Sequence, residues 1–336
     1  MSRNDNGTDI VSSELGDNIA ANEQTIAVKK VKEIPAGNNL MIVIGLVLVG
    51  FFVGQLLASI VMLGMAISNG LSIESLLNDP NSLYDAVSME AALVSQMLYT
   101  LFFTFVTPWF YLRVVAKKPI KSLSTEHKVN PLLLLIVVGA TFAFMFVNAY
   151  IIEWNMGWTF PEFMSGFEQW ARQMEDDLAA ATERFTTFDS FGQFLLGFFA
   201  IAILPGVGEE LLFRGVLQNG LQRVVKNQHV AIWVAAFIFS AIHMQIFGLV
   251  PRMVLGAIFG YLYVWSGNIW YPIIGHIANN GIGVIVAYLF SLGLIDSDME
   301  DPESMPITLS LIGLIFFAAL MFLFRNHYLK QKNIRE

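Results

Sequence analysis

The sequence predicts an all-α membrane protein, a bundle of about eight transmembrane helices with both termini in the cytoplasm. Of its 336 residues, 55% are hydrophobic and only 14% are charged, whereas soluble domains carry about 25% charged residues. Several apolar stretches reach the ~20 residues of helix that a bilayer core of ~30 Å requires. In addition, basic and acidic connections alternate along the chain. Composition, segment length and charge pattern therefore indicate the same class.

Composition also excludes several functions. The net charge of −8 argues against a nucleic-acid partner. The absence of cysteine excludes thiolate zinc sites, disulfides and cysteine nucleophiles, so any metal must use His, Asp, Glu or Asn. Residues 1–36 are polar, rich in Asn and without apolar periodicity, which predicts a disordered tail. This tail lacks the short apolar run and the cleavage site of a signal peptide.

The apolar stretches divide the chain into segments. We expect spans at about 40–68, 91–112, 131–152, 191–221, 230–250, 253–265, 270–294 and 307–324. The first three spans form an N-terminal unit, 37–152, which is followed by a non-cytoplasmic connection, 153–190. Residues 191–294 form the membrane core, and residues 295–336 contain an acidic loop, the last span and a basic tail.

The connections predict the orientation of these spans. Basic residues occur before the first span and after the second, fourth and eighth: Lys29, Lys30, Lys32, Arg113, Lys117, Lys118, Lys121, Arg223, Lys226, Arg325, Lys330 and Lys332. The intervening connections are acidic, with Glu74, Asp79, Asp85, Glu175, Asp176, Asp177, Asp296, Asp298 and Glu300. Because Lys and Arg are retained on the cytoplasmic side, an even number of spans with both termini inside follows. We expect a multi-pass protein of the cell's inner or plasma membrane.

The connection between the third and fourth spans has a helical period of its own. Its apolar residues recur at three- and four-residue spacing: Phe160, Phe163, Met164, Phe167, Trp170, Ala171, Met174 and Leu178. Glu168, Glu175 and Asp176 occupy the opposite face. This pattern predicts an amphipathic helix in the membrane interface, which acts as an anchor or, alternatively, as a lid.

The most informative stretch is Glu-Glu-Leu-Leu-Phe-Arg at 209–214. A charge in hydrocarbon costs roughly 2.5–3.5 kcal/mol on insertion scales, so such residues usually mark function. Glu210 and Arg214 are i,i+4 neighbours, a spacing that favours an ion pair. Glu209 lies about 100° away around the helix axis. We therefore expect Glu210 and Arg214 to form a structural clamp, and Glu209 to face a cavity as a general base.

Two further polar pairs occur in the downstream spans. His243 follows Phe239 by four residues, and Asn280 follows His276 by four. His243 could share a water with Glu209, either as a base partner or as a metal ligand, while His276 and Asn280 present donors to a developing oxyanion. Alone, His243 is equally consistent with interhelical hydrogen bonding, and His276 with Asn280 favours it. Phe239 is interpreted as a packing residue. Together these polar groups indicate hydrolysis by an activated water.

The order Glu-Glu-x-x-x-Arg, Phe-x-x-x-His and His-x-x-x-Asn on successive membrane helices resembles the CPBP family. This is the CAAX-protease and bacteriocin-processing family, also called Abi, which includes the type II CAAX prenyl endopeptidase. The resemblance covers about residues 191–294. It implies that Glu209 is the base, His243 its partner, and His276 and Asn280 the oxyanion donors. It also implies that Glu210 and Arg214 organise the site, and that Glu209, His243 and His276 are candidate Zn²⁺ ligands.

Three functions follow as hypotheses. The first is an intramembrane endopeptidase, of the metal- or glutamate-dependent type. It would cut membrane-embedded or lipid-anchored proteins or peptides near or within the cytoplasmic half of the bilayer. The second is a non-catalytic scaffold or immunity factor on the same fold. The third is a transporter whose Glu and His relay protons, although the earlier spans hold no comparable polar groups.

Overall fold

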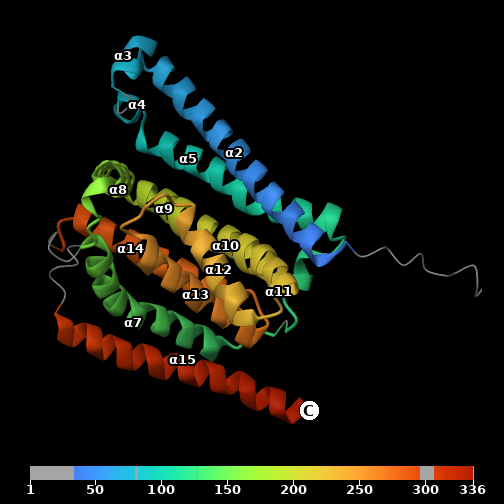
Figure 1. The fold of residues 1–336 in the computed structure, drawn as a ribbon. Coiled ribbons are helices and arrows are strands. Elements are labelled where there is room, and N and C mark those ends of the chain that lie inside the picture. The colour runs from blue at the N-terminus through green and yellow to red at the C-terminus, as the bar shows by residue number, and fades with distance from the viewer. Residues whose placement is uncertain (1–33, 80–81, 127, 296–305, 336) are drawn as a thin grey trace, which may run out of the picture.

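The structure, a computed structural model, describes residues 34–79, 82–126, 128–295 and 306–335. Every regular element in these residues is a helix, which confirms the predicted all-α class (Figure 1). The predicted polar tail as far as residue 33, and the acidic loop at 296–305, lie outside the described residues.

Seven helical segments in the described part of the chain are long and apolar enough to cross a membrane. They are α2 (Ala36–Ser68), the composite helix Met89–Val115, α7 (Pro131–Met156), the composite helix Phe191–Val225, α13 (Leu249–Ser266), α14 (Trp270–Ser291) and α15 (Ile307–Arg335). An eighth apolar helix, α12 (Gln228–Ala241), has only 14 residues, which at 1.5 Å per residue is shorter than the ~30 Å hydrocarbon core. The protein is therefore an integral, multi-pass membrane protein.

Both composite helices contain wide turns. The first comprises α5 (Met89–Thr100), η1 (Leu101–Val106), α6 (Thr107–Phe110) and η2 (Tyr111–Val115). The second comprises α9 (Phe191–Gly197), η5 (Phe198–Ile203), α10 (Leu204–Glu210), η6 (Leu211–Gln218) and α11 (Asn219–Val225). The segments η1, η2, η5 and η6 are π-helical, and such turns frequently occur at functional sites. Two of them flank α10, which holds Glu209.

The predicted fifth span, 230–250, differs in the structure because its helix ends at Ala241. Residues 242–248 connect it to α13, with Met244 in the left-handed region at φ 57°. The Ser240 hydroxyl donates to the Leu249 carbonyl and closes the connection. No proline interrupts this stretch, so the sequence pattern did not reveal the break. The break is important because it places His243 in the connection instead of on a helix face.

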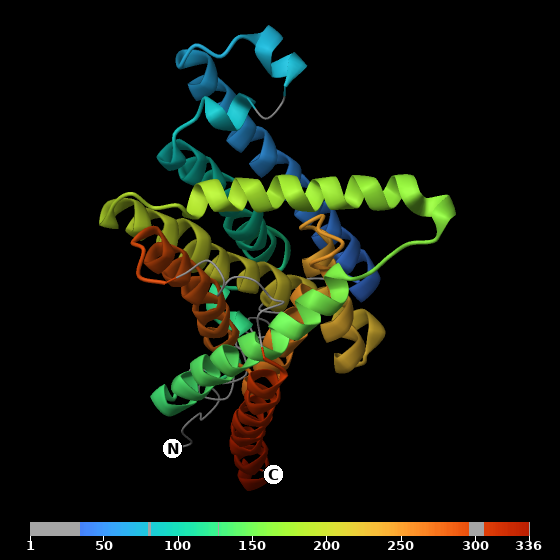
Figure 2. The same ribbon diagram turned by 90° about the vertical axis from the view of Figure 1, so that its left-hand side faces the viewer.

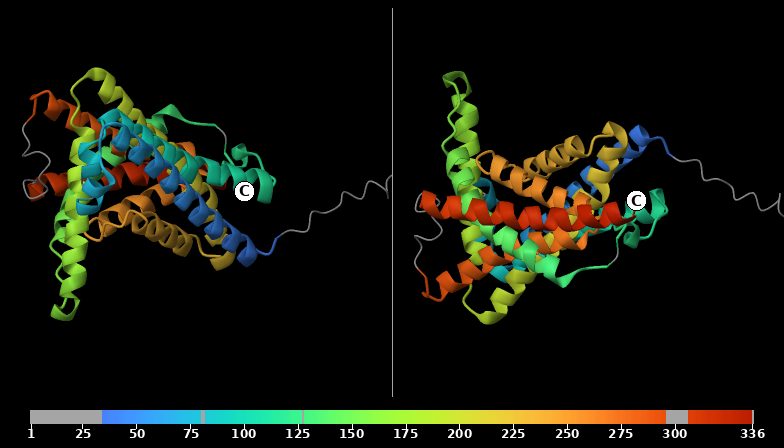
Figure 3. Two further views of the ribbon diagram at one scale, coloured as in Figure 1. Left: turned by 90° about the horizontal axis from the view of Figure 1, so that it is seen from above. Right: turned by 90° about the horizontal axis from the view of Figure 1, so that it is seen from below.

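The amphipathic segment forms α8 (Ser165–Thr186), preceded by η4 (Glu162–Met164). It lies across one end of the bundle, roughly perpendicular to the long helices (Figures 2 and 3). The short helices α3 (Ile73–Asn78) and α4 (Ser82–Asp85) lie at this same end, whereas η3 (Ile120–Leu123) lies at the other (Figure 1). The predicted helix is confirmed: it crosses the end of the bundle, and one of its ends projects beyond the other helices (Figure 3).

The two ends of the bundle differ in charge. Helix α2 begins and α15 ends at the end opposite α8 (Figures 1 and 3). The connections at this terminal end are rich in basic residues: Arg113, Lys117, Lys118, Lys121, Lys128, Arg223 and Lys226. The α8 end is rich in acidic residues: Glu74, Asp79, Asp85, Glu162, Glu168, Asp176, Asp177, Glu183 and Asp189. The arginines of α8 are paired, Arg172 with Glu168 and Arg184 with Asp85.

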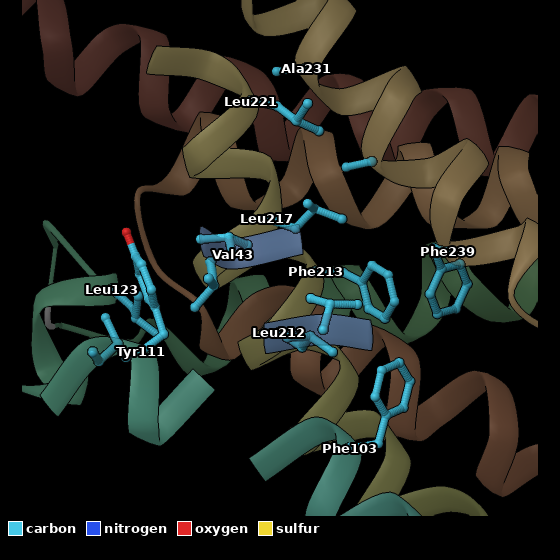
Figure 4. Packing of buried hydrophobic residues seen from close by; sticks show 14 residues of the cluster. Val43, Phe103, Tyr111, Leu123, Leu212, Phe213, Leu217, Leu221, Ala231 and Phe239 are labelled. Atoms are coloured by element: carbon cyan, nitrogen blue, oxygen red, sulfur yellow. The ribbon is translucent and has the colours of Figure 1, made fainter. Parts of the chain in front are cut away.

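Packing of large apolar side chains holds the site helices in register. Helix α15 packs along α7, α12 along α13, and α2 along α5. In one buried cluster, the Phe213 ring of η6 lies 5.1 Å from Phe239 of α12 and 6.5 Å from Phe103 of η1 (Figure 4). Phe239 is only 3% exposed, so its predicted packing role is confirmed. This contact holds α12 against the helix that carries the two glutamates.

A close helix approach lies next to Glu209. A Cβ on Gly208 would overlap the Thr104 hydroxyl and the Phe105 ring. We expect Gly208→Ala to lower the free energy of unfolding by about 1–3 kcal/mol, the usual cost of overpacking. The matched control is Gly45→Ala, because a Cβ there meets nothing within 4 Å. Thermal unfolding in detergent measures both variants, and equal melting temperatures for the two would contradict the close approach.

Candidate active site

The four predicted site residues line one cavity of about 370 Å³. Glu209 comes from α10 and His243 from the connection between α12 and α13. His276 and Asn280 come from α14, and Phe239 also contributes to the wall. Side chains that lie up to 71 positions apart in the sequence thus meet in one place.

Glu210 and Arg214 form a buried clamp. Arg214 Nη1 donates to Glu210 Oε1 at 2.7 Å, and its Nη2 donates to the Gly256 carbonyl at 2.6 Å. Glu210 is 0% exposed and Arg214 1% exposed. The guanidinium also lies over the Phe239 ring, 5.0 Å from its centroid. The clamp therefore ties η6 to α12 and α13 through charge-assisted and cation–π contacts.

The clamp also orients His276. The Nδ1 atom of His276 lies 2.7 Å from Glu210 Oε1. Because an ionised carboxylate only accepts hydrogen bonds, Nδ1 carries a proton and Nε2 is the second functional nitrogen. His276 Nε2 lies 3.8 Å from Glu209 Oε2. The Glu210 carboxylate thus fixes both the tautomer and the ring orientation of His276.

Glu209 differs from its neighbour in its surroundings. Its side chain is 17% exposed and faces the cavity, whereas the Glu210 side chain is 0% exposed. The roughly 100° offset between successive helix residues separates the two carboxylates, as the sequence indicates. Glu209 is thus the carboxylate that can contact water or substrate.

His243 presents one nitrogen to the cavity. Its Nδ1 atom lies 2.8 Å from the Phe239 carbonyl, which accepts the Nδ1 proton. The remaining nitrogen, Nε2, then has a free lone pair and can accept a proton from water. The rings of His243 and His276 lie 5.2 Å and 5.9 Å from the Phe239 ring. Phe239 therefore packs against both imidazoles.

Asn280 has a local structural partner. Pro205 has no N–H to donate to the carbonyl four residues earlier, that of Ile201. Asn280 Nδ2 donates to this Ile201 carbonyl at 3.0 Å. Its Oδ1 accepts from Asn279 Nδ2 at 3.1 Å. Asn280 thus fastens α14 to the Glu209 helix, and its second N–H is the one that can serve an oxyanion.

The candidate metal ligands are Glu209, His243 and His276. Within the described residues, no three His, Asp or Glu side chains form a group that could hold a metal ion. Glu209, His243 and His276 thus do not fit a zinc set in this structure, although two of them approach each other. Zinc stays a prediction of the family resemblance, and the reaction steps below use only the protein's own groups.

Sequence reasoning missed a polar chain at the outer part of the cavity. Arg252 Nη2 donates to Gln245 Oε1 at 2.5 Å, and Gln245 Nε2 donates to Glu175 Oε1 at 2.9 Å. Glu175 belongs to α8, so this chain ties α8 to the connection that holds His243. Arg252 could have been identified from the sequence, because it is the one charged residue within the apolar stretch 246–264. Gln245 had no such signal.

Burial raises the pKa of the Glu175 carboxyl above its ordinary value of 4.5, while Arg252 acts in the opposite direction and Asp176 adds a smaller upward effect. A raised carboxyl pKa means that the folded state favours the protonated form. The stabilisation of docked α8 by protonated Glu175 is therefore complete below pH 4.5, and it is lost as the pH rises through the folded-state pKa of Glu175. We expect hydrogen–deuterium exchange in α8, corrected for intrinsic rates, to accelerate over that range. Glu175→Gln should remove this pH dependence, and an unchanged pH profile in the variant would refute the assignment.

The fold and the cavity define a class of protein: a multi-pass membrane protein that holds a carboxylate, two imidazoles and a carboxamide around a cavity among its helices. Residues 191–282 match the family described as type II CAAX prenyl endopeptidase, Rce1-like. This stretch of the membrane core is therefore similar to the Rce1-like family, which confirms the resemblance inferred from the three motifs.

The chain is also similar to a bacterial protein. It is 30% identical over 80 residues to the "Uncharacterized protein YpbD" of Bacillus subtilis (strain 168), a match that covers 23% of this chain and 38% of that relative. The match thus spans less than half the length of either protein. No solved structure matches the chain.

Proposed function

We propose that this protein is an intramembrane endopeptidase that hydrolyses peptide bonds of membrane-associated proteins or peptides through a water activated by Glu209 and His243. The Rce1-like family of its core supports a protease as the class of protein. The observation that carries the mechanism is the common cavity of Glu209, His243, His276 and Asn280. A cavity lined by convergent polar groups among membrane helices suits a hydrolytic site.

The first step is attack by water. Glu209 accepts one proton as the water oxygen bonds to the carbonyl carbon of the scissile peptide, and His243 Nε2 accepts a hydrogen bond from the same water. The carbonyl π electrons move to the oxygen, which becomes an oxyanion. Because no group of the protein forms a covalent bond to the substrate, no serine or cysteine nucleophile is needed.

The second step is collapse of the tetrahedral intermediate. The carbon–nitrogen bond breaks, its electron pair goes to nitrogen, and Glu209 returns its proton to that nitrogen. His276, with Nδ1–H held by Glu210, can offer Nε2–H to the oxyanion when this second nitrogen also carries a proton, and Asn280 offers its second N–H. Removal of one such donor typically costs about 10²–10³ in kcat.

The experiment that tests the function is comparative membrane proteomics of cells with wild-type protein and with Glu209→Gln. We expect at least one membrane-associated polypeptide to accumulate uncut in the variant, and its purified form to be cleaved by the wild-type protein alone. If Glu209→Gln supports the full biological role without any accumulating polypeptide, the protein acts as a non-catalytic scaffold instead. Proton flux through proteoliposomes that depends on Glu209 would indicate a transporter.

A further inference from the structure

A second, larger cavity continues from the candidate active site and lies under α8. We call it the α8 groove; its volume is about 1180 Å³ and its walls come from α7, α8, η5 and α14, together with Arg252 of α13. It shares Asn148, Ile152, Arg252, Asn279 and Asn280 with the active-site cavity. The two cavities therefore adjoin each other along these residues, which makes the groove a candidate path from the surface of the protein to Glu209.

The walls of the α8 groove suit an extended polypeptide. Small residues, Ala180 of α8 with Gly283 and Ala287 of α14, leave room for a backbone and its side chains. Asn148, Asn279 and Asn280 also line the groove. Carboxamide side chains can both donate hydrogen bonds to a peptide backbone and accept them from it.

The groove opens at the acidic end of the bundle. Its lining includes Asp176, Glu183 and Thr187 of the α8 segment and Phe290 near the end of α14. Neither cavity is lined by the described residues of the basic connections at 113–130 or 223–227. Because Lys and Arg are retained on the cytoplasmic side, the α8 end is the non-cytoplasmic one.

We propose that the substrate polypeptide approaches from the non-cytoplasmic side of the membrane and lies in the α8 groove, with its scissile bond at Glu209. This inference rests on the proposed function and specifies its substrate as a polypeptide presented outside the cytoplasm. It differs from the sequence-based hypothesis of cleavage in the cytoplasmic half, because α8 and the short α12 place access to the site at the other end. The acidic groups at the mouth disfavour strongly acidic segments.

The side of access can be measured without any proteolysis. The natural chain has no cysteine, so single-cysteine variants of the full protein can be labelled with a membrane-impermeant maleimide. We expect Gly283→Cys to react in intact cells, and Arg223→Cys at the basic end to react only after permeabilisation. Gly45→Cys, on the exposed face of α2, should react in neither case because it faces lipid. Labelling of Gly283→Cys only in inverted vesicles would overturn the proposal and leave the proposed protease activity intact.

A bulky side chain placed in the α8 groove tests whether the substrate binds there. A Cβ at Gly283 or at Gly45 meets nothing within 4 Å, so the start of a larger side chain causes no overlap at either position. We expect Gly283→Phe to lower cleavage of a purified substrate by about a hundredfold, the loss that follows when a reacting bond is displaced by ~1 Å. Gly45→Phe should retain wild-type cleavage, and both variants should melt like the wild type. Equal cleavage by the two variants would show that the substrate does not use this groove.

Discussion

Glu209→Gln is expected to lower the rate of peptide-bond cleavage by about 10²–10⁴-fold, the usual contribution of a general base. The amide keeps the shape of the carboxylate but accepts no proton from water. Since the Glu209 side chain faces the cavity and takes no part in the buried clamp, the melting temperature should change little. A single-turnover assay with purified substrate measures the effect, because it separates chemistry from binding and release.

The control for this prediction is Glu162→Gln, an exposed glutamate outside the cavity, which should cleave like the wild type. His243→Gln provides a second comparison. If Glu209 and His243 activate the same water, the double variant should lose little more activity than the more impaired single variant, as for residues that act as a unit. Multiplicative losses, or full activity in both single variants, would contradict the shared water.

Arg214→Ala is expected to destabilise the folded protein by about 3–5 kcal/mol, because it leaves the Glu210 carboxylate buried without its partner. Thermal unfolding in detergent, monitored by circular dichroism, measures this loss. Glu210→Gln should cost less, since a neutral amide can still contact the guanidinium and His276. Both variants should also reduce cleavage, because the clamp orients His276.

The chain offers a matched control for Arg214. Arg172 and Glu168 in α8 form a second i,i+4 ion pair with the same N–O distance, 2.7 Å, but their side chains are 45% and 19% exposed. Exposed pairs contribute about 0–1 kcal/mol, so Arg172→Ala should shift the melting temperature far less. If the two variants shift it equally, burial does not decide the strength of the clamp, and our account of it is wrong.

The sequence was sufficient to predict features that depend on residues close to one another in the chain. An apolar stretch must form a helix in lipid because its backbone has no other hydrogen-bond partners, so α2, α7 and α15 begin within about four residues of the predicted positions. The Glu210–Arg214 pair was predictable because four residues complete about one helix turn. The periodic apolar face of α8 was visible for the same reason.

Contacts between distant segments could not be predicted in this way. The end of α12 at Ala241 depends on the hydrogen bond from Ser240 to Leu249, and it moves His243 off the helix. In the link from Glu175 through Gln245 to Arg252, the first two residues are 70 positions apart. No periodicity in the sequence indicates such pairs. The sequence therefore left open whether α8 acts as an anchor or as a lid, and it did not predict the link from α8 to the connection that holds His243.

The amino-acid sequence by itself determined that this chain is a helical membrane protein, which side chains carry its polar chemistry, and that Glu209 and Glu210 face different directions. These properties follow from the cost of burying polar groups in lipid and from the helix repeat, both of which act over a few residues. Only the tertiary structure decided that the polar groups share one cavity and that the groove opens beneath α8. It also decided that Asn280 donates a hydrogen bond to the Ile201 carbonyl, to which Pro205 has no N–H to donate. Those features depend on how separate helices pack against one another. This packing is determined by the shapes of side chains throughout the bundle.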